Sequence, residues 1–197
     1  MDSVFAWITQ NWVEILASAL GLLGIFLQIR QNHWYWLTSI IMVSLYIVVF
    51  YNTRFYADMS FQFYYLCISI YGWYYWLSGR NSKNVEKIIA YRLKNVQWLY
   101  TVLISVFIFI AIYLILKNFT NSDVALGDAF TTSLSFVATW LLARKIIENW
   151  LFWIVIDLVS AGLYVYKSLY PTAILFVVLT VLAFVGYYRW KKFLVND

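Results

Sequence analysis

Long apolar runs, separated by short polar connections, follow one another along the whole chain. The runs are 12–29, 34–52, 56–78, 96–116, 125–143, 149–166 and 171–189. Each has about the length that a helix needs to cross the hydrocarbon core of a bilayer, roughly 20 residues. None shows the short alternating segments of a membrane barrel. The pattern therefore predicts an all-α integral membrane protein with seven transmembrane helices.

Composition leaves little chain for anything outside the bilayer. Hydrophobic residues make up 64% of the chain and charged residues 12%, and the mean hydropathy is +0.74. Soluble domains have about 45–50% apolar and about 25% charged residues. The one long polar connection, 79–95, is too short for a soluble domain. The chain also has a single histidine, His33, which makes a histidine-based metal site unexpected. We find no catalytic triad, metal-ligand cluster or glycine-rich phosphate loop, so we expect neither an enzyme nor a bound cofactor or metal.

The basic residues are distributed unevenly between the two sets of loops. Eleven of the 14 Lys and Arg residues fall in the loops on the side of the C-terminus, and three fall on the other side. The positive-inside rule then predicts a cytoplasmic C-terminus and an N-terminus outside. This bias accounts for the formal charge of +5, so nucleic-acid binding is not expected.

Parts of the chain repeat. The stretch "NHWYW" resembles "NWLFW", and "YGWYYW" resembles "VGYYRW". Three such landmarks recur in the same order, at offsets of 114 to 118: 32–36 with 149–153, 45–51 with 163–170, and 71–76 with 185–190. We predict two parallel three-helix bundles, at 1–78 and 125–197, joined by the basic loop and a linker helix at 79–124. The alternative is that aromatic-rich interfacial segments resemble one another by chance.

Polar and aromatic residues form stripes at helical spacing within the predicted spans. In transporters built from repeats, the substrate binds near the bilayer midplane where the repeats meet. Residues three or four apart share a helix face, and a polar face is unfavourable in lipid. The stripes give these candidate substrate-binding residues: Asn149, Trp153, Asp157 and Tyr164 on 149–166; Gln62, Ser69 and Trp73 on 56–78; Asn32 and Trp36 on or before 34–52.

Aromatic faces, amides and a buried acid favour one kind of ligand, a flat, polar, cationic heterocycle. Rings stack on such a ligand, amides bind its edges, and a carboxylate offsets its charge. An acid at the centre of a helix costs about 2.5–3.5 kcal/mol on the insertion scale, so Asp157 needs a function. Asp157 alternatively pairs with a hydroxyl of a neighbouring helix. For Glu148 we expect an ion pair with Arg144 or Lys145.

Two other classes of function stay open on the residues alone. One is a membrane scaffold without a ligand, whose inward faces would be small and apolar rather than rich in amides and rings. The other is a proton-coupled transporter that uses Asp157 as its carrier.

The block "ARKIIENWLFWIVIDLVS" at 143–160, together with "YGWYYW" and the closing "GYYRW", resembles the PnuC family of bacterial vitamin transporters. The resemblance covers roughly 12–192. It implies seven helices in a full-length relative of the SWEET fold and a homotrimer in the bacterial inner membrane. It also implies facilitated diffusion of an unphosphorylated B-vitamin, which a cytoplasmic kinase then traps by adding phosphate.

Carried over by motif, the substrate contacts of that family fall on Gln62, Trp73, Asn149 and Trp153. The chain departs from nicotinamide riboside members at two places: Asp157 stands where an amide can occur, and Tyr75 where a second glutamine can stand. These departures favour thiamine, the substrate of the PnuT branch, with nicotinamide riboside as the alternative. Both vitamins are cationic aromatic heterocycles.

Overall fold

The structure, a computed structural model, describes residues 20–21, 23–52, 54, 56–78, 89–120 and 123–195. The predicted N-terminal location and most of the basic loop lie outside these residues. Of the first predicted span, 20–21 and 23–29 are described and are helical. Six further helices follow: α2 (Trp34–Asn52), α3 (Tyr56–Ser78), α4 (Asn95–Phe119), α5 (Ala125–Ala143), α6 (Asn149–Tyr166) and α7 (Tyr170–Lys191). Their bounds agree closely with the predicted spans.

Five of the described helices are long and apolar enough to cross a membrane: α2, α4, α5, α6 and α7. The helix α3 has 23 residues but is not among them. It is rich in tyrosine and carries Asp58 and Gln62, which lower its hydropathy. The low hydropathy of α3 therefore reflects the polar and aromatic stripe that the sequence placed on it.

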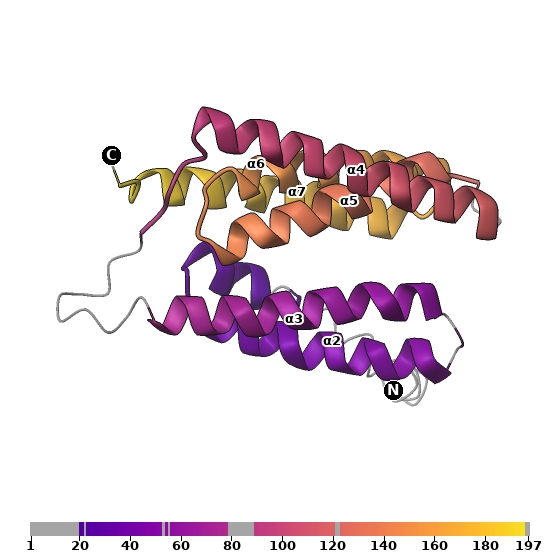
Figure 1. Ribbon diagram of the computed structural model, residues 1–197, viewed down its shortest axis with the longest axis horizontal. Helices are drawn as coiled ribbons and strands as arrows, with labels where there is room; N and C mark the ends of the chain where they lie inside the picture. Colours follow the sequence, from indigo (N-terminus) through magenta and orange to yellow (C-terminus); the bar gives the residue numbers. More distant parts are fainter. Residues whose placement is uncertain are drawn as a thin grey trace, which may run out of the picture. The chain divides into compact units, whose positions relative to one another are not determined.

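The chain divides into two compact units, residues 1–83 and 84–197. In the first unit α2 packs along α3 (Figure 1). In the second unit α6 packs against α5 and α7, and α5 also packs against α4. The helix α4, predicted as a linker, thus packs within the second unit; the domain boundaries drawn from the sequence stay a prediction.

The ends of corresponding helices in the two units have the same local geometry. Gln31 and Lys145 have φ of 50° and 57°, and Arg54 and Ser168 have φ of 63° and 59°. Each pair is 114 residues apart. The Asn32 N–H donates to the Leu27 carbonyl, and 114 residues later the Ile146 N–H donates to the Leu141 carbonyl, both at 2.9 Å. At Gln31 and Lys145, the left-handed residue and the backward hydrogen bond of the next residue form a Schellman cap, here without glycine.

A tryptophan fills a glycine notch in each unit, again at the same offset. A Cβ added to Gly72 would lie 2.5 Å from the Trp36 indole, and one added to Gly186 would lie 2.5 Å from the Trp150 indole. Each indole also meets a second tryptophan edge-on, with 5.5 Å between ring centroids and interplanar angles of 87° and 89°. We call these sets the Trp–Gly–Trp clusters: Trp36, Gly72 and Trp76 in the first unit; Trp150, Gly186 and Trp190 in the second.

The clusters support the internal duplication, and they change the residue-by-residue alignment of the two copies that the sequence landmarks gave. A constant offset of 114 relates the caps and the clusters, so Trp36 corresponds to Trp150 and not to Trp153. Two of the three landmark alignments, at offsets of 117 and 118, were therefore wrong by about one helical turn. A shift of one turn leaves the same helix face aligned, so a pattern of aromatic letters does not detect it.

Candidate functional site

Asn149 opens α6 with its side chain completely buried. Its Nδ2 donates to the carbonyl of Ile146 at 2.5 Å. That bond fixes which side of the amide is nitrogen, because the carbonyl can only accept. The Oδ1 atom is buried and has no hydrogen-bond partner among the described residues. Since buried polar groups are nearly always satisfied, this acceptor is free for a ligand.

Trp153 and Asp157 continue the same face of α6, one and two turns beyond Asn149. The Trp153 ring is partly exposed, but its Nε1 is buried and has no partner in the described parts of the chain. Asp157 is 5% exposed, and the described residues provide no hydrogen bond or ion pair for its carboxylate. A hydroxyl partner for Asp157, the alternative drawn from the sequence, is thus not found there.

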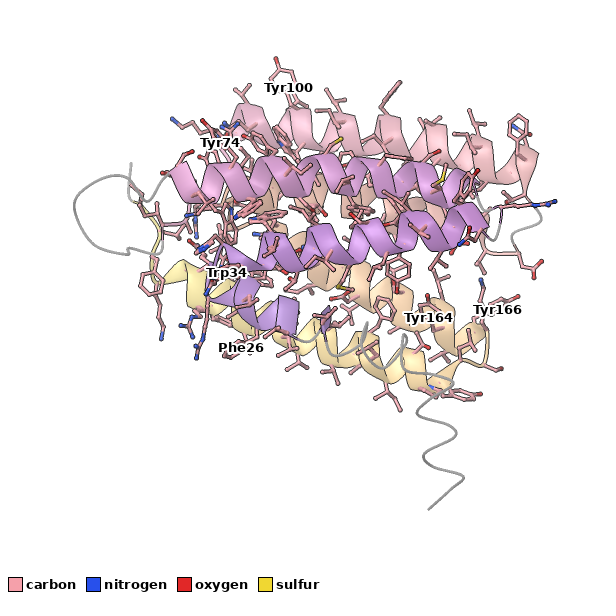
Figure 2. All side chains as sticks on the ribbon, turned by 90° about the horizontal axis from the view of Figure 1, so that it is seen from below. Phe26, Trp34, Tyr74, Tyr100, Tyr164 and Tyr166 are labelled. Atoms are coloured by element: carbon pink, nitrogen blue, oxygen red, sulfur yellow. The ribbon has the colours of Figure 1, made fainter. Side chains whose placement is uncertain are left out.

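Tyr164, the last predicted residue of this stripe, has a contact that the others lack. Its ring stacks on Phe176 of α7, with centroids 5.2 Å apart and planes at 18°. It lies at the end of α6 next to the exposed Tyr166 (Figure 2). This contact holds α6 to α7, so the geometry gives Tyr164 a packing role.

The predicted residues of the first unit divide in the same way. Trp73 resembles Trp153, because it is partly exposed while its Nε1 is buried without a partner among the described residues. Gln62 is half-buried. Ser69, by contrast, is hydrogen-bonded to Ser39 of α2 at 2.8 Å, a bond that joins the two helices.

Two further predicted residues of the first unit serve its local structure. The Oδ1 of Asn32 accepts the Trp34 N–H at 3.0 Å and so caps the start of α2. Trp36 is completely buried in its Trp–Gly–Trp cluster. Its Nε1 also lacks a partner among the described residues, as does that of Trp150. Trp73 and Trp153 differ from these two residues because their rings are also partly exposed, so their Nε1 atoms stay candidates for a ligand contact.

Many aromatic side chains of the described residues are exposed. Tyr74 is 72% exposed and Tyr100 is 60% exposed. Tyr100 extends from α4 away from its unit (Figure 2). Such rings are typical of the interfacial belts of membrane proteins. The high aromatic content alone therefore does not locate a binding site, and the buried polar atoms on α6 are the more specific candidates.

Glu148 has a role that the sequence did not reveal. Its Oε2 accepts the backbone N–H of Leu93 at 3.2 Å. The expected ion pair with Arg144 or Lys145 stays a prediction. Burial raises the pKa of Glu148, an effect that backbone hydrogen bonds and the charge of Arg92 partly oppose. Burial also lowers the pKa of Lys145. The partner of Glu148 is 55 residues away, too distant for a local sequence pattern to indicate it.

The candidate site on α6 consists of groups suited to binding. In the described parts of the chain, no three His, Cys, Asp or Glu residues gather into a set that could hold a metal ion. The α6 face supplies an acceptor at Asn149, a ring with an N–H donor at Trp153, and a carboxylate at Asp157. These groups recognise a molecule that carries hydrogen-bond donors, an aromatic ring and positive charge.

Comparison with known proteins identifies the kind of protein that this chain resembles. The family model described as "Nicotinamide mononucleotide transporter" matches residues 11–192. The nicotinamide riboside transporter PnuC of Escherichia coli (strain K12) is 26% identical over 204 residues, covering 91% of this chain and 85% of that protein. The PnuC protein of Neisseria mucosa is 24% identical over 199 residues, covering 96% of this chain and 75% of that protein.

A solved structure shows the same fold. The crystal structure of the vitamin B3 transporter PnuC matches 98% of this chain and 86% of its own, with a TM-score of 0.72 and 23% sequence identity. The predicted all-helical membrane architecture is thereby confirmed. The preference for the thiamine branch is not supported, because the named relatives are nicotinamide riboside transporters.

Proposed function

Because the chain belongs to the nicotinamide mononucleotide transporter family, whose model covers residues 11–192, we propose that it transports nicotinamide riboside. Membership makes the chain a multi-pass membrane protein of a transporter family and not an enzyme. The substrate itself is our proposal. It replaces thiamine, since the named relatives act on nicotinamide riboside.

The single observation that carries this proposal is the unpartnered Oδ1 of Asn149 in a fully buried side chain. Nicotinamide riboside has donors that suit it, in its carboxamide N–H groups and its ribose hydroxyls. A site that buries such an acceptor discriminates strongly against a molecule without the matching donor, because the acceptor would stay unpaired.

The other two residues of the face complement the rest of the molecule. The indole of Trp153 offers a ring for stacking on the pyridinium and a buried N–H donor. The carboxylate of Asp157, buried without a protein partner among the described residues, offsets the positive charge of the ring. Thiamine also carries a cationic ring, an amino group and a hydroxyl, so neither Asp157 nor the Asn149 acceptor excludes it by itself.

We further propose that transport is facilitated diffusion, with a cytoplasmic kinase trapping the vitamin by phosphorylation, and that the protein forms a homotrimer. Both follow from the family resemblance of the motifs. Proteoliposomes without a kinase should only equilibrate the vitamin. Accumulation driven by an imposed proton gradient would instead favour the proton-coupled alternative, with Asp157 as carrier.

Calorimetry on the purified protein tests the substrate and the site together. We expect nicotinamide riboside to bind more tightly than thiamine or riboflavin. Asn149→Ala and Trp153→Ala should each weaken that binding by more than about tenfold, the scale of a buried hydrogen bond and of a lost aromatic contact. The control is Trp150→Phe, whose ring lies in the Gly186 notch. It should lower thermal stability and leave the affinity nearly unchanged.

Two results would contradict the proposal. Tighter binding of thiamine than of nicotinamide riboside would return the protein to the thiamine branch. Equal affinity in the Asn149, Trp153 and Trp150 variants would remove the α6 face from the site.

A further inference from the structure

The segment 89–93, which leads into α4, is held on both sides by backbone hydrogen bonds. On one side, Tyr91 N–H donates to the Lys145 carbonyl at 3.0 Å and Ile147 N–H donates to the Tyr91 carbonyl at 2.9 Å. On the other side, Ala90 N–H donates to the Phe193 carbonyl and Val195 N–H to the Ala90 carbonyl, both at 3.1 Å. We call 89–93 with its partners 145–147 and 193–195 the clasp.

Glu148 adds a side-chain hydrogen bond to the clasp. Its Oε2 accepts the N–H of Leu93, the last residue of the segment. Both side chains are largely buried, Glu148 at 7% and Leu93 at 9% exposure. Leu93 is followed by Lys94, whose N–H donates to Gln97 in the first turn of α4. The carboxylate therefore ties the start of α6 to the start of α4.

The clasp reaches Asn149 through Ile146. The backbone of Ile146 pairs with Tyr91 in the clasp. The carbonyl of Ile146 is also the group that receives the Asn149 amide N–H, at 2.5 Å. Movement of 145–147 would thus rotate the Asn149 amide and change where its unpartnered Oδ1 points. Glu148 lies directly between the clasp and Asn149 in the chain.

The first unit has different side chains at the corresponding positions. At the offset of 114, Asn32 corresponds to Ile146 and Trp34 to Glu148. Asn32 caps the Trp34 N–H with its own side chain. Trp34 is 52% exposed, so it lacks the buried setting of Glu148. The two units therefore differ at this helix start: Asn32 makes a short-range cap, whereas Glu148 bonds to a residue 55 positions away in the sequence.

We propose that Glu148 is a positioning residue for the substrate: by holding 89–93 against the start of α6, it fixes the Asn149 amide with its Oδ1 atom available to the ligand. This inference rests on the proposed function of Asn149. Glu148 itself would not touch the substrate and would act through Asn149.

A double-mutant cycle tests it, with nicotinamide riboside as the probe and calorimetry as the readout. Glu148→Ala should weaken binding about tenfold in the otherwise native protein. In an Asn149→Ala background it should weaken binding less than about twofold further, because the residue through which it acts is gone. Glu148→Gln keeps an acceptor oxygen for Leu93 and should restore most of the lost affinity. Val195→Pro removes a clasp bond on the side away from Ile146 and serves as the control, with nearly native affinity.

Equal weakening by Glu148→Ala in both backgrounds, or no weakening in either, would overturn the inference, as would a Glu148→Gln variant as weak as Glu148→Ala. Hydrogen exchange measured by mass spectrometry gives a readout that needs no ligand. Glu148→Ala should speed exchange in 89–93 and 146–149, and Glu148→Gln should not. If the native protein binds no nicotinamide riboside, the proposed function fails by itself, while unchanged exchange in Glu148→Ala would overturn the positioning role separately.

Discussion

The helix pairs α2–α3 and α6–α7 are two versions of one structure with different contents. They share the Trp–Gly–Trp cluster, with equal centroid distances of 5.5 Å, and left-handed caps at matching residues. They differ on the helix surface that we propose as the ligand-binding site. At the positions of Asn149, Trp153 and Asp157, the first unit has Tyr35, Ser39 and Val43.

This difference separates what holds a unit together from what the protein binds with. The residues that recur at the offset of 114 are packing and capping residues. In the first unit, the hydroxyl of Ser39 is hydrogen-bonded to the hydroxyl of Ser69. The corresponding residues in the second unit are Trp153 and Ala183, and the indole N–H of Trp153 has no partner among the described residues. At these positions the second unit thus lacks the hydroxyl pair that joins the helices of the first unit, and it has instead an indole that we propose as a ligand contact.

The largest expected effect comes from filling the notch in either unit. Gly72→Ala and Gly186→Ala place a Cβ 2.5 Å from a buried indole, within the hard-contact distance. Each should destabilise the protein by about 3 kcal/mol, at the upper end for an overpacked core. Thermal melts in detergent would measure this as matched drops in melting temperature.

Gly162→Ala is the matched control, because nothing lies within 4 Å of an added Cβ there. Alanine is the better helix former, so this variant should be neutral or slightly stabilising. A large drop for Gly186→Ala with none for Gly72→Ala would mean that the two clusters are not equivalent.

Asp157→Val gives the second unit the residue that the first unit has at Val43. We expect nicotinamide riboside affinity to fall by about 1–3 kcal/mol, the scale of a charge-assisted bond. The melting temperature should hold or rise, because a buried carboxylate without a partner among the described residues is removed. Binding titrations and melts on the same sample separate the two effects. Unchanged affinity with a lower melting temperature would make Asp157 a packing residue.

The pH dependence of the protein's stability should come in part from Glu148, a residue that has no acidic counterpart in the first unit. Burial raises its pKa, so the folded protein holds this proton more tightly than the unfolded chain does. The favourable contribution is then fully present below the ordinary carboxyl pKa of about 4.3 and is lost as pH rises through the raised value. Melting temperatures of the native protein should fall more between acidic and neutral pH than those of Glu148→Gln. Parallel curves for the two proteins would argue against this assignment.

The smallest effect concerns the left-handed caps. Arg54 and Ser168 have φ of 63° and 59°, which costs an L-residue about 1–2 kcal/mol. Replacing either by glycine relieves this strain but adds freedom to the unfolded chain, so a gain of about 0.5–1 kcal/mol is expected in each. Denaturant or thermal melts would compare the two. Stabilisation at one position and destabilisation at the other would show that the caps carry different strain.

The sequence by itself determined the helices and most of the binding stripe. Hydrophobic runs of bilayer length fix helices in a membrane, because every backbone polar group must be satisfied within its own segment. Spacing by three and four placed Asn149, Trp153 and Asp157 on one face, since helical periodicity is a property of the chain alone. The sequence also indicated the duplication, although with a register that was wrong by one turn in two of three landmarks.

Only the tertiary structure decided which of those residues already have partners. Ser69, Asn32 and Trp36 match the pattern as well as Asn149 does, but they meet Ser39, the Trp34 N–H and Gly72. The clasp and the role of Glu148 were equally beyond local reasoning, because the bond from Leu93 joins residues 55 apart. A stripe depends on neighbours a few residues away, whereas hydrogen-bond satisfaction and close packing depend on which distant segments the fold brings together.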